Sequence, residues 1–338
     1  MRLIFRIAFI LFAFSLVFVP IKEKAQSVAA ASDANSYTYL IFGMDDAAEN
    51  TDAILLVSYN SNSERLSILQ IPRDTYARSE RGVHKINALY RIEQLSGYSK
   101  KESLDRTATY ISNALGVKID AFFGFGTKAL VDGIDALGGI TVTMPYDYTF
   151  TDGQGNPIFE MQKGDNLLSG RQSEYFVRHR QSYELGDLDR LDAQKLFIAG
   201  VINTLKNGVS LSRVLSVVGA VSDGVVTDAS LTDAAVLFFK HRGSIASADV
   251  RYATLPGKAI FDNDDGVWYY VPAKAASSAL LLNFFDTSGI FDENGVLFNC
   301  EKIEHREIYY SDNISSKIFN NNDITNEVKL WKMQKAKD

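Results

Sequence analysis

Short runs of β-forming residues alternate with helical patterns along most of this chain, and this alternation constrains its fold more than any other feature. The runs YTYLIFG, DAILLVSYN and RLSILQIP come first, and the SNSE sequence between the last two is typical of a hairpin turn. The helical pattern that follows has Ser99 as its expected N-cap and Gly116 as its expected C-cap. Further strands are predicted at 119–126, 140–145 and 250–257, and further helices at 127–139, 191–208, 211–222 and 230–241. The alternation predicts an α/β fold in which a mixed central β-sheet is flanked by helices.

The N-terminus is a basic and apolar segment. Arg2 and Arg6 precede an apolar run from Ile7 to Pro20. The alanines after Val28 would suit a cleaved signal peptide. An uncleaved membrane helix needs roughly 17–25 apolar residues, so this run is at the short end. We favour the anchor, because the alanines lie far from the apolar run. Both interpretations place the chain from Gln26 onward outside the cytoplasm.

The domain boundaries follow from these patterns. We assign residues 1–21 to the anchor or signal segment and 22–36 to a small, polar linker. Residues 37–284 form the expected extracytoplasmic domain, and 285–338 a C-terminal appendage that is rich in Asn, Asp and Lys. The expected location is therefore the cell membrane, with a single pass, or the exterior if the segment is cleaved.

Composition excludes several classes of protein. A net charge of -6 and a pI near 5.4 do not suit a general nucleic-acid binder, which must neutralise phosphates. The single cysteine, Cys300, allows no intramolecular disulfide and no thiol-rich metal site. The 4 histidines show no metal-ligand spacing. An anion site in this chain must therefore be local.

Carboxylates gather between the first two predicted strands. Asp45, Asp46 and Asp52 flank this loop. Converging carboxylates could bind Mg²⁺, which accepts one or two of them together with phosphate oxygens and water. Aspartate is also a common turn residue, and spacing alone favours that simpler interpretation.

Basic residues follow two later strands. Arg73 and Asp74 emerge directly after Pro72, and Lys85 precedes a short helical segment. Arg73 and Asp74 could form a surface ion pair, but a guanidinium also binds phosphate through two hydrogen bonds. An isolated lysine such as Lys85 is usually only solvated.

The stretch YFVRHR presents two closely spaced arginines. If it is extended, Arg178 and Arg180 project to one face and His179 to the other. Two adjacent guanidiniums suit an anion such as a diphosphate. Arg190 would lie near the start of the next helix, where backbone N–H groups also favour anions. The nearby acidic residues could instead neutralise the arginines, and physical reasoning alone leaves both alternatives open.

Taken in order, these groups resemble the LytR-CpsA-Psr family of bacterial cell-envelope proteins. The matching pieces cover about 37–208 and are LIFGMDD, NTDAILLVS, LSILQIPRDTY, HKINALY, LVDGIDALGGITVTMP, LLSGRQSEYFVRHR and GDLDRLDAQ. The resemblance implies a phosphotransferase that moves a glycopolymer, of the teichoic acid or capsular polysaccharide type, from a polyprenyl-pyrophosphate carrier to peptidoglycan. It also implies an apolar pocket for the lipid.

The resemblance further assigns roles to individual residues. Asp45 and Asp52 would hold Mg²⁺ (or Mn²⁺), Asp187 would orient or deprotonate the acceptor hydroxyl, and Asp74 would orient Arg73. The pyrophosphate would bind to Arg73, Lys85, Arg178, Arg180, Arg190 and Gln194.

Two positions depart from the family pattern. Asn50 and Ala193 stand where the family usually or often has arginine. Two alternatives stay open. The same site could act as a pyrophosphatase on the lipid carrier, with water as acceptor, and the smaller number of positive charges would also suit a non-enzymatic binding or regulatory module at the cell surface.

Overall fold

The computed structural model describes a defined part of the chain. It comprises residues 36–45, 50–180, 183, 187–231, 243–244, 246–263, 266–285, 308–314, 317–321 and 324, with only the backbone at 187–189 and 308–314. The expected anchor, nearly all of the linker and most of the helix expected at 230–241 lie outside this part. Within it, no helix is both long enough and apolar enough to cross a membrane.

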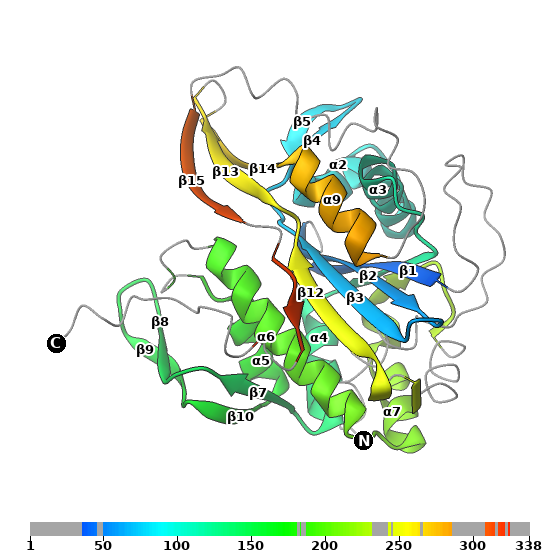
Figure 1. The fold of residues 1–338 in the computed structure, drawn as a ribbon, viewed down its shortest axis with the longest axis vertical. Coiled ribbons are helices and arrows are strands. Elements are labelled where there is room, and N and C mark those ends of the chain that lie inside the picture. Colours follow the sequence, from blue (N-terminus) through cyan, green and yellow to red (C-terminus); the bar gives the residue numbers. More distant parts are fainter. Residues whose placement is uncertain are drawn as a thin grey trace.

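A seven-stranded sheet forms the centre of the molecule (Figure 1). In spatial order its strands are β11 (Val225–Thr227), β6 (Ala121–Phe125), β1 (Ser36–Met44), β2 (Thr51–Asn60), β3 (Arg65–Ile71), β12 (Asp249–Thr254) and β16 (Phe319–Asn320). The pairs β1–β6 and β3–β12 are parallel, and the other neighbours are antiparallel. The predicted α/β class with a mixed sheet is therefore confirmed.

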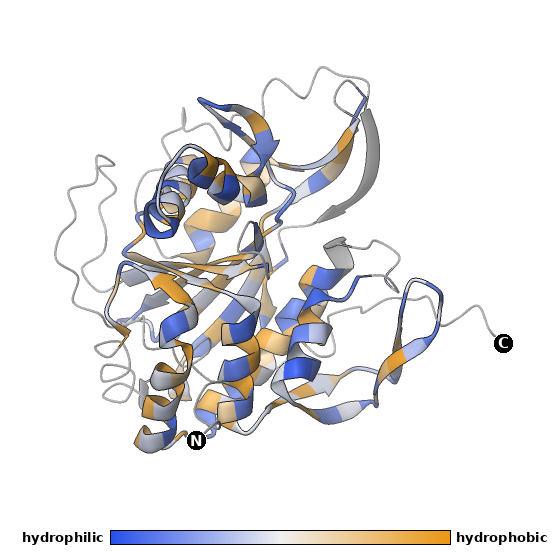
Figure 2. Cartoon of the chain, turned by 180° about the vertical axis from the view of Figure 1, so that it is seen from behind, coloured by the Kyte–Doolittle hydropathy of each residue, from blue (hydrophilic) through white to orange (hydrophobic). Residues whose placement is uncertain are grey.

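Helices cover both faces of this sheet (Figure 1). One face packs against α4 (Thr127–Leu137), α5 (Gly170–Arg178), α6 (Asp187–Lys206) and α7 (Leu211–Val221), and the other against α2 (Leu89–Leu95), α3 (Lys100–Leu115) and α9 (Lys274–Phe284). Alternate residues of β1 divide between the two cores: Tyr39 and Ile41 face the first, Leu40 and Phe42 the second. This explains why the strand is apolar throughout rather than at every second position. Helices α3, α4, α5 and α7 are amphipathic, as one-sided burial requires, and Figure 2 shows helices that carry both hydrophobic and hydrophilic residues.

Local sequence signals set the ends of these helices. Ser99 forms a capping box with Glu102 at the start of α3, and Gly116, with a φ of 63°, ends the helix as predicted. Two glycines allow close packing on the first face. A Cβ at Gly170 would overlap the carbonyl oxygen of Val131 in α4, and a Cβ at Gly200 would overlap a carbonyl oxygen of β7.

Smaller strand pairs surround the central sheet. They are β4 (Tyr76–Ser79) with β5 (Gly82–Lys85), β7 (Ile140–Met144) with β10 (Gly164–Leu168), β8 (Tyr148–Thr151) with β9 (Pro157–Met161), and β13 (Gly257–Asp262) with both β14 (Val267–Pro272) and β15 (Ile308–Ile314). Both β15 and β16 come from the segment after residue 285. Parts of this segment are thus paired into sheets of the domain, which its weak pattern did not indicate.

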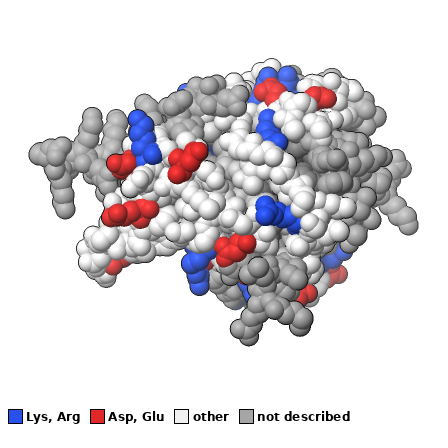
Figure 3. Space-filling view, turned by 90° about the horizontal axis from the view of Figure 1, so that it is seen from below, with Lys and Arg blue, Asp and Glu red and all other residues white. Residues whose placement is uncertain are grey.

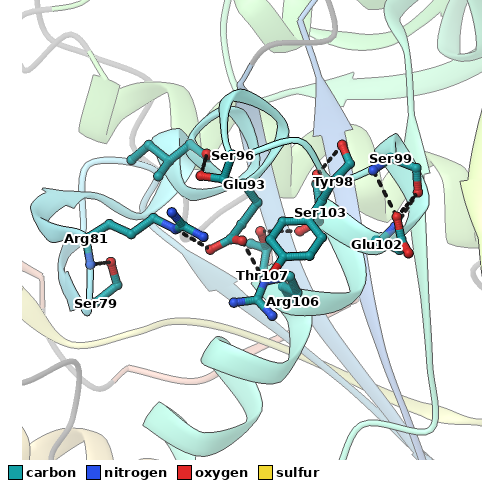
Figure 4. A network of polar contacts seen from close by, with 11 residues as sticks. Ser79, Arg81, Glu93, Ser96, Tyr98, Ser99, Glu102, Ser103, Arg106 and Thr107 are labelled. Atoms are coloured by element: carbon teal, nitrogen blue, oxygen red, sulfur yellow. Dashed lines mark hydrogen bonds and ion pairs between the residues drawn. The ribbon is translucent and has the colours of Figure 1, made fainter.

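An ion-pair network ties α2 to its neighbours (Figure 4). The carboxylate of Glu93 accepts hydrogen bonds from Arg106 Nε of α3 at 2.6 Å and from Arg81 Nε of the β4–β5 turn at 3.4 Å. Arg106 also stacks over the ring of Tyr98, 4.5 Å from its centroid. The network therefore holds the β4–β5 hairpin, and with it Lys85 at the end of β5, against the helical layer.

Candidate active site

One cavity lies where the parallel strands β1 and β6 end and where α5 and α6 meet. Including its open mouth and the solvent in it, the space that protein atoms do not fill is about 670 Å³. Its walls are mainly apolar and include Leu55, Phe125, Leu130, Val177, Phe197 and Ile198. Its charged lining residues are Asp45, Asp52, Arg178 and Arg190, and Gln194 contributes an amide. The structure thus brings together five of the residues singled out in the sequence.

The two carboxylates of the cavity are held by different partners. Asp45 Oδ2 accepts a hydrogen bond from Asn50 Nδ2 at 2.9 Å. Asp52 Oδ1 accepts one from Arg73 Nη1 at 2.7 Å. Burial and, next, the negative charge of Asp45 raise the pKa of the Tyr90 hydroxyl to about 12, so Tyr90 stays neutral at physiological pH.

These carboxylates suit a divalent cation of the magnesium type. Among the described residues, no group of three or more His, Cys, Asp and Glu could hold a metal ion by itself. Mg²⁺ does not need such a cage, because it takes one or two carboxylates together with waters and substrate phosphate oxygens. Asp45 and Asp52 line one cavity and would supply that pair of carboxylates.

Arg190, near the start of α6, contacts the strand β2 beside the cavity. Its Nη2 donates to the backbone carbonyl oxygen of Asp52 at 3.0 Å, and its side chain is buried. Arg190 therefore lies against the strand that carries Asp52, as well as lining the cavity. A buried guanidinium in this position holds a fixed positive charge where the cavity also contains two carboxylates.

Arg73, Asp74 and Lys85 form a chain of ion pairs beside the cavity. Lys85 Nζ lies 3.1 Å from Asp74 Oδ1, whereas Arg73 Nε lies 4.0 Å from the same oxygen. Asp74 is thus closer to Lys85 than to Arg73, the residue that it was expected to orient. Arg73 and Lys85 are not among the residues that line the cavity, and Arg73 is linked to it through Asp52.

The extended conformation expected for YFVRHR is wrong. The first four residues of this stretch, 175–178, are the last turn of the helix α5. The other two, His179 and Arg180, come after the helix. A capping box of Ser169 and Gln172 starts this helix, and it outweighs the β-propensity of the Tyr-Phe-Val run. Arg178 lines the cavity, while Arg180 is exposed and does not. The two arginines therefore do not form a pair of side chains on one face of a strand.

His179 points away from the cavity, into an aromatic cluster. Its ring lies 5.1 Å from Phe150, 5.2 Å from Tyr175 and 5.2 Å from Tyr183, measured between centroids. Burial lowers the pKa of its imidazole to about 4. His179 is thus neutral at physiological pH and packs as an aromatic residue.

Two further side chains were not recognised from the sequence. Glu174 of α5 accepts hydrogen bonds from Arg171 and Arg178. Gln70 is buried in β3, and its Nε2 donates to the carbonyl oxygen of Leu191 in α6 at 2.9 Å. The lone amide within the apolar run LSILQIP was the available signal for Gln70. The spacing of Arg171, Glu174 and Arg178, three and four residues apart, was the available signal for Glu174, and it indicates ion pairs only if this segment is a helix.

The remaining expected positions have mixed outcomes. Asp187 begins α6, but its side chain lies outside the described part of the chain, so its role stays a prediction. Ala193 is fully buried in the core of the first face. Asn50 serves as the hydrogen-bond partner of Asp45.

Comparison with known proteins agrees with these motifs. Residues 19–283 match the LytR_cpsA_psr family. The chain belongs to this family. The resemblance seen in the sequence is therefore confirmed.

Individual relatives have low sequence identity to this chain but match most of its length. The polyisoprenyl-teichoic acid–peptidoglycan teichoic acid transferase TagU of Oceanobacillus iheyensis is 25% identical over 243 residues, which cover 71% of this chain and 72% of TagU. TagU of Bacillus subtilis is 24% identical over 261 residues, or 76% and 79% of the two chains. Because these family relatives are transferases, the prediction of an enzyme of the phosphotransferase class is confirmed.

Solved structures share the fold. Bacillus subtilis TagV has a TM-score of 0.61 at 21% identity, over 76% of this chain and 100% of TagV. Protein gbs0355 of Streptococcus agalactiae has a TM-score of 0.63 at 21% identity, over 82% and 99% of the two chains.

Proposed function

We propose that this protein transfers a glycopolymer from a polyprenyl-pyrophosphate carrier to peptidoglycan and leaves a phosphodiester bond. The observation that carries this proposal is a single cavity that combines apolar walls with two aspartates and two arginines. The apolar walls suit a prenyl chain, and the charged groups suit its pyrophosphate. The names of the relatives, which specify a polyisoprenyl-linked teichoic acid donor and a peptidoglycan acceptor, support the same substrates.

The charges of the cavity suit a metal-bound diphosphate. The two aspartates and two arginines that line it cancel one another. A bound divalent cation would leave two positive charges, which match the two negative charges of a diphosphate diester. On the face shown in Figure 3, basic and acidic side chains are interspersed, which does not favour a long polyanion such as nucleic acid.

The residues of the site have separate parts in this reaction. The acceptor hydroxyl attacks the phosphorus that carries the glycan, the P–O bond to the bridging oxygen breaks, and polyprenyl phosphate leaves. Arg178 and Arg190 neutralise the phosphate charge, and Asp187 accepts the hydroxyl proton. Mg²⁺, held by Asp45 and Asp52, would stabilise the charge that develops on the phosphate oxygens. Such a transfer needs positioning and charge neutralisation rather than a nucleophilic side chain.

The N-terminal segment would place this reaction on the outer side of the cell membrane. We propose that residues 1–21 anchor the protein and that the domain lies outside the cytoplasm. The two arginines before the apolar run would remain on the cytoplasmic side and orient the anchor.

The direct test is a transfer assay with the full-length protein in detergent micelles. It contains a polyprenyl-pyrophosphoryl glycan, Mg²⁺ and a peptidoglycan acceptor, and it measures glycan bound to the acceptor. We expect Asp52→Asn and Arg178→Ala to lower kcat/KM by about 10²–10³ and EDTA to abolish transfer. Arg251→Ala is the matched control, because it removes a guanidinium that pairs with Asp249 in β12 and does not line the cavity.

The other outcomes separate the alternatives. Release of free phosphorylated glycan with water as acceptor would show a pyrophosphatase. Lipid binding without turnover would show a binding module, a role that Asn50 and Ala193 favour because each removes a family arginine. Equal transfer by Asp52→Asn, Arg178→Ala and the unchanged protein would refute the proposed site.

A further inference from the structure

Glu174 is a nearly buried carboxylate that lies one helical turn before Arg178. Its side chain is 9% exposed, and both of its oxygens accept hydrogen bonds from arginines. Oε1 accepts from Arg178 Nη1 at 2.8 Å, and Oε2 from Arg171 Nη1 at 2.5 Å. A carboxylate in such a place needs charged partners, because removal from water penalises an unpaired charge.

The two arginines differ in what they can reach. Arg171 is 82% exposed and is not part of the cavity lining, whereas Arg178 is 40% exposed and lines the cavity. Glu174 therefore joins a surface arginine to a cavity arginine. Only the second of these contacts bears on a ligand in the cavity.

The contact with Glu174 restricts the conformation of Arg178 and offsets part of its positive charge. Its long side chain has many rotamers, and a hydrogen bond to a carboxylate on the same helix face restricts them. Arg178 also shares the cavity with Arg190, so two positive charges lie near one another before a ligand binds. The negative charge of Glu174 offsets that repulsion. A guanidinium has five N–H donors, so a bond through Nη1 is compatible with a bidentate phosphate contact through its other nitrogens.

We propose that Glu174 is a positioning residue that fixes the guanidinium of Arg178 for the pyrophosphate of the lipid substrate. This proposal rests on the proposed function, in which Arg178 binds that pyrophosphate. Glu174 itself does not touch the substrate. Its contribution is to binding of the charged head group and not to binding of the prenyl chain.

The test is calorimetric titration of the full-length protein with geranylgeranyl pyrophosphate and Mg²⁺, and separately with geranylgeraniol, which lacks the phosphates. We expect E174L, which keeps the volume but removes the acceptor, to raise the Kd for the pyrophosphate about tenfold, a factor set by loss of one charged contact. The Kd for the alcohol stays within about twofold, because the apolar walls are unchanged. E174Q restores binding to within about threefold, since its amide oxygen still accepts from Arg178.

Two more variants complete the experiment. R171Q removes the other partner of Glu174 and is the matched control, so we expect the same Kd as for the unchanged protein. E174D keeps the charge but withdraws the carboxylate by one methylene, and we expect a Kd raised about threefold. Thermal unfolding of each variant shows whether it folds. If E174L does not fold, the Kd of E174D for the pyrophosphate tests the proposal in its place.

Several results would overturn the proposal. Unchanged or tighter pyrophosphate binding by E174L and E174D would show that Glu174 only neutralises Arg178. An equal loss of pyrophosphate and alcohol binding would show a purely structural role. If the unchanged protein does not bind the pyrophosphate, the proposed function fails first. If it binds and R178A weakens binding while the Glu174 variants do not, only the role of Glu174 is refuted.

Discussion

His179 illustrates how a single buried side chain can make stability depend on pH. Burial lowers the pKa of its imidazole to about 4 in the folded protein, against about 6.5 in an unfolded chain. The unfolded state therefore binds more protons between these values, and stability falls as the pH drops from about 6.5 toward 4. The part of this loss that His179 causes reaches about 2 kcal/mol at pH 5. H179F keeps an aromatic ring and removes this part.

The measurement is urea unfolding of both proteins at pH 7.5 and pH 5. Other titrating groups are common to the two proteins, so the difference in pH dependence reports His179. We expect the unchanged protein to lose about 2 kcal/mol more than H179F between the two pH values. Equal losses would show that the imidazole is not held neutral by burial.

At the scale of the element, the sequence predicted five strands of the central sheet (β1, β2, β3, β6 and β12), the strand β7 and the helices α3, α4, α6 and α7, because periodicity and caps are local signals. The other short strands around the central sheet, and the helices α5 and α9, were not predicted. The helix ending at Arg178 shows the limit of this reasoning. Its Tyr-Phe-Val run favours a strand by propensity, while the Ser169–Gln172 capping box three residues apart favours a helix. The cap is a local signal that distinguishes the two, but the prediction for YFVRHR did not take it into account. The pairing of β16 with β12 had no local signal, because it joins residues far apart in the chain.

Gln70 forms hydrogen bonds that hold α6 against the central sheet. Its Nε2 donates to the carbonyl oxygen of Leu191 at 2.9 Å and lies 3.5 Å from Gln194 Oε1, and its Oε1 accepts from Thr254 Oγ1 at 3.2 Å. All of these groups are buried, so Q70L would leave polar atoms without their partner. We expect Q70L to lower the free energy of unfolding by about 2–3 kcal/mol and T254V by about 1 kcal/mol.

A double-mutant cycle tests this network. Q70L/T254V removes both ends of one hydrogen bond, so its effect should be smaller than the sum of the single effects. Urea unfolding of the four proteins measures the coupling. Additive effects would contradict a direct hydrogen bond between Gln70 and Thr254.

At the scale of the whole molecule, the cavity depends on contacts between distant parts of the chain. Arg190 Nη2 meets the carbonyl of Asp52 across 138 positions, and Gln70 meets the carbonyl of Leu191 across 121. No periodicity or spacing could predict these contacts. The ordered motifs could only indicate which residues gather, and Arg180 and Lys85 show that order in the sequence does not ensure a place in the cavity lining.

Residues Asn321 and Ile324 of the C-terminal segment contact α6, β12 and the core of the first face. Asn321 Nδ2 donates to Asn203 Oδ1 of α6 at 2.6 Å, and its own Oδ1 accepts from the hydroxyl of Tyr252 in β12 at 2.6 Å. Ile324 is 1% exposed and belongs to the core beneath α6. Compared with a chain that ends at residue 324, a chain that ends at residue 316 should lose at least about 3 kcal/mol of unfolding free energy. Urea unfolding of the two proteins measures this difference. Equal stabilities would show that the segment is an accessory to the domain, whereas the expected loss would make it part of the support for the helix that carries Arg190.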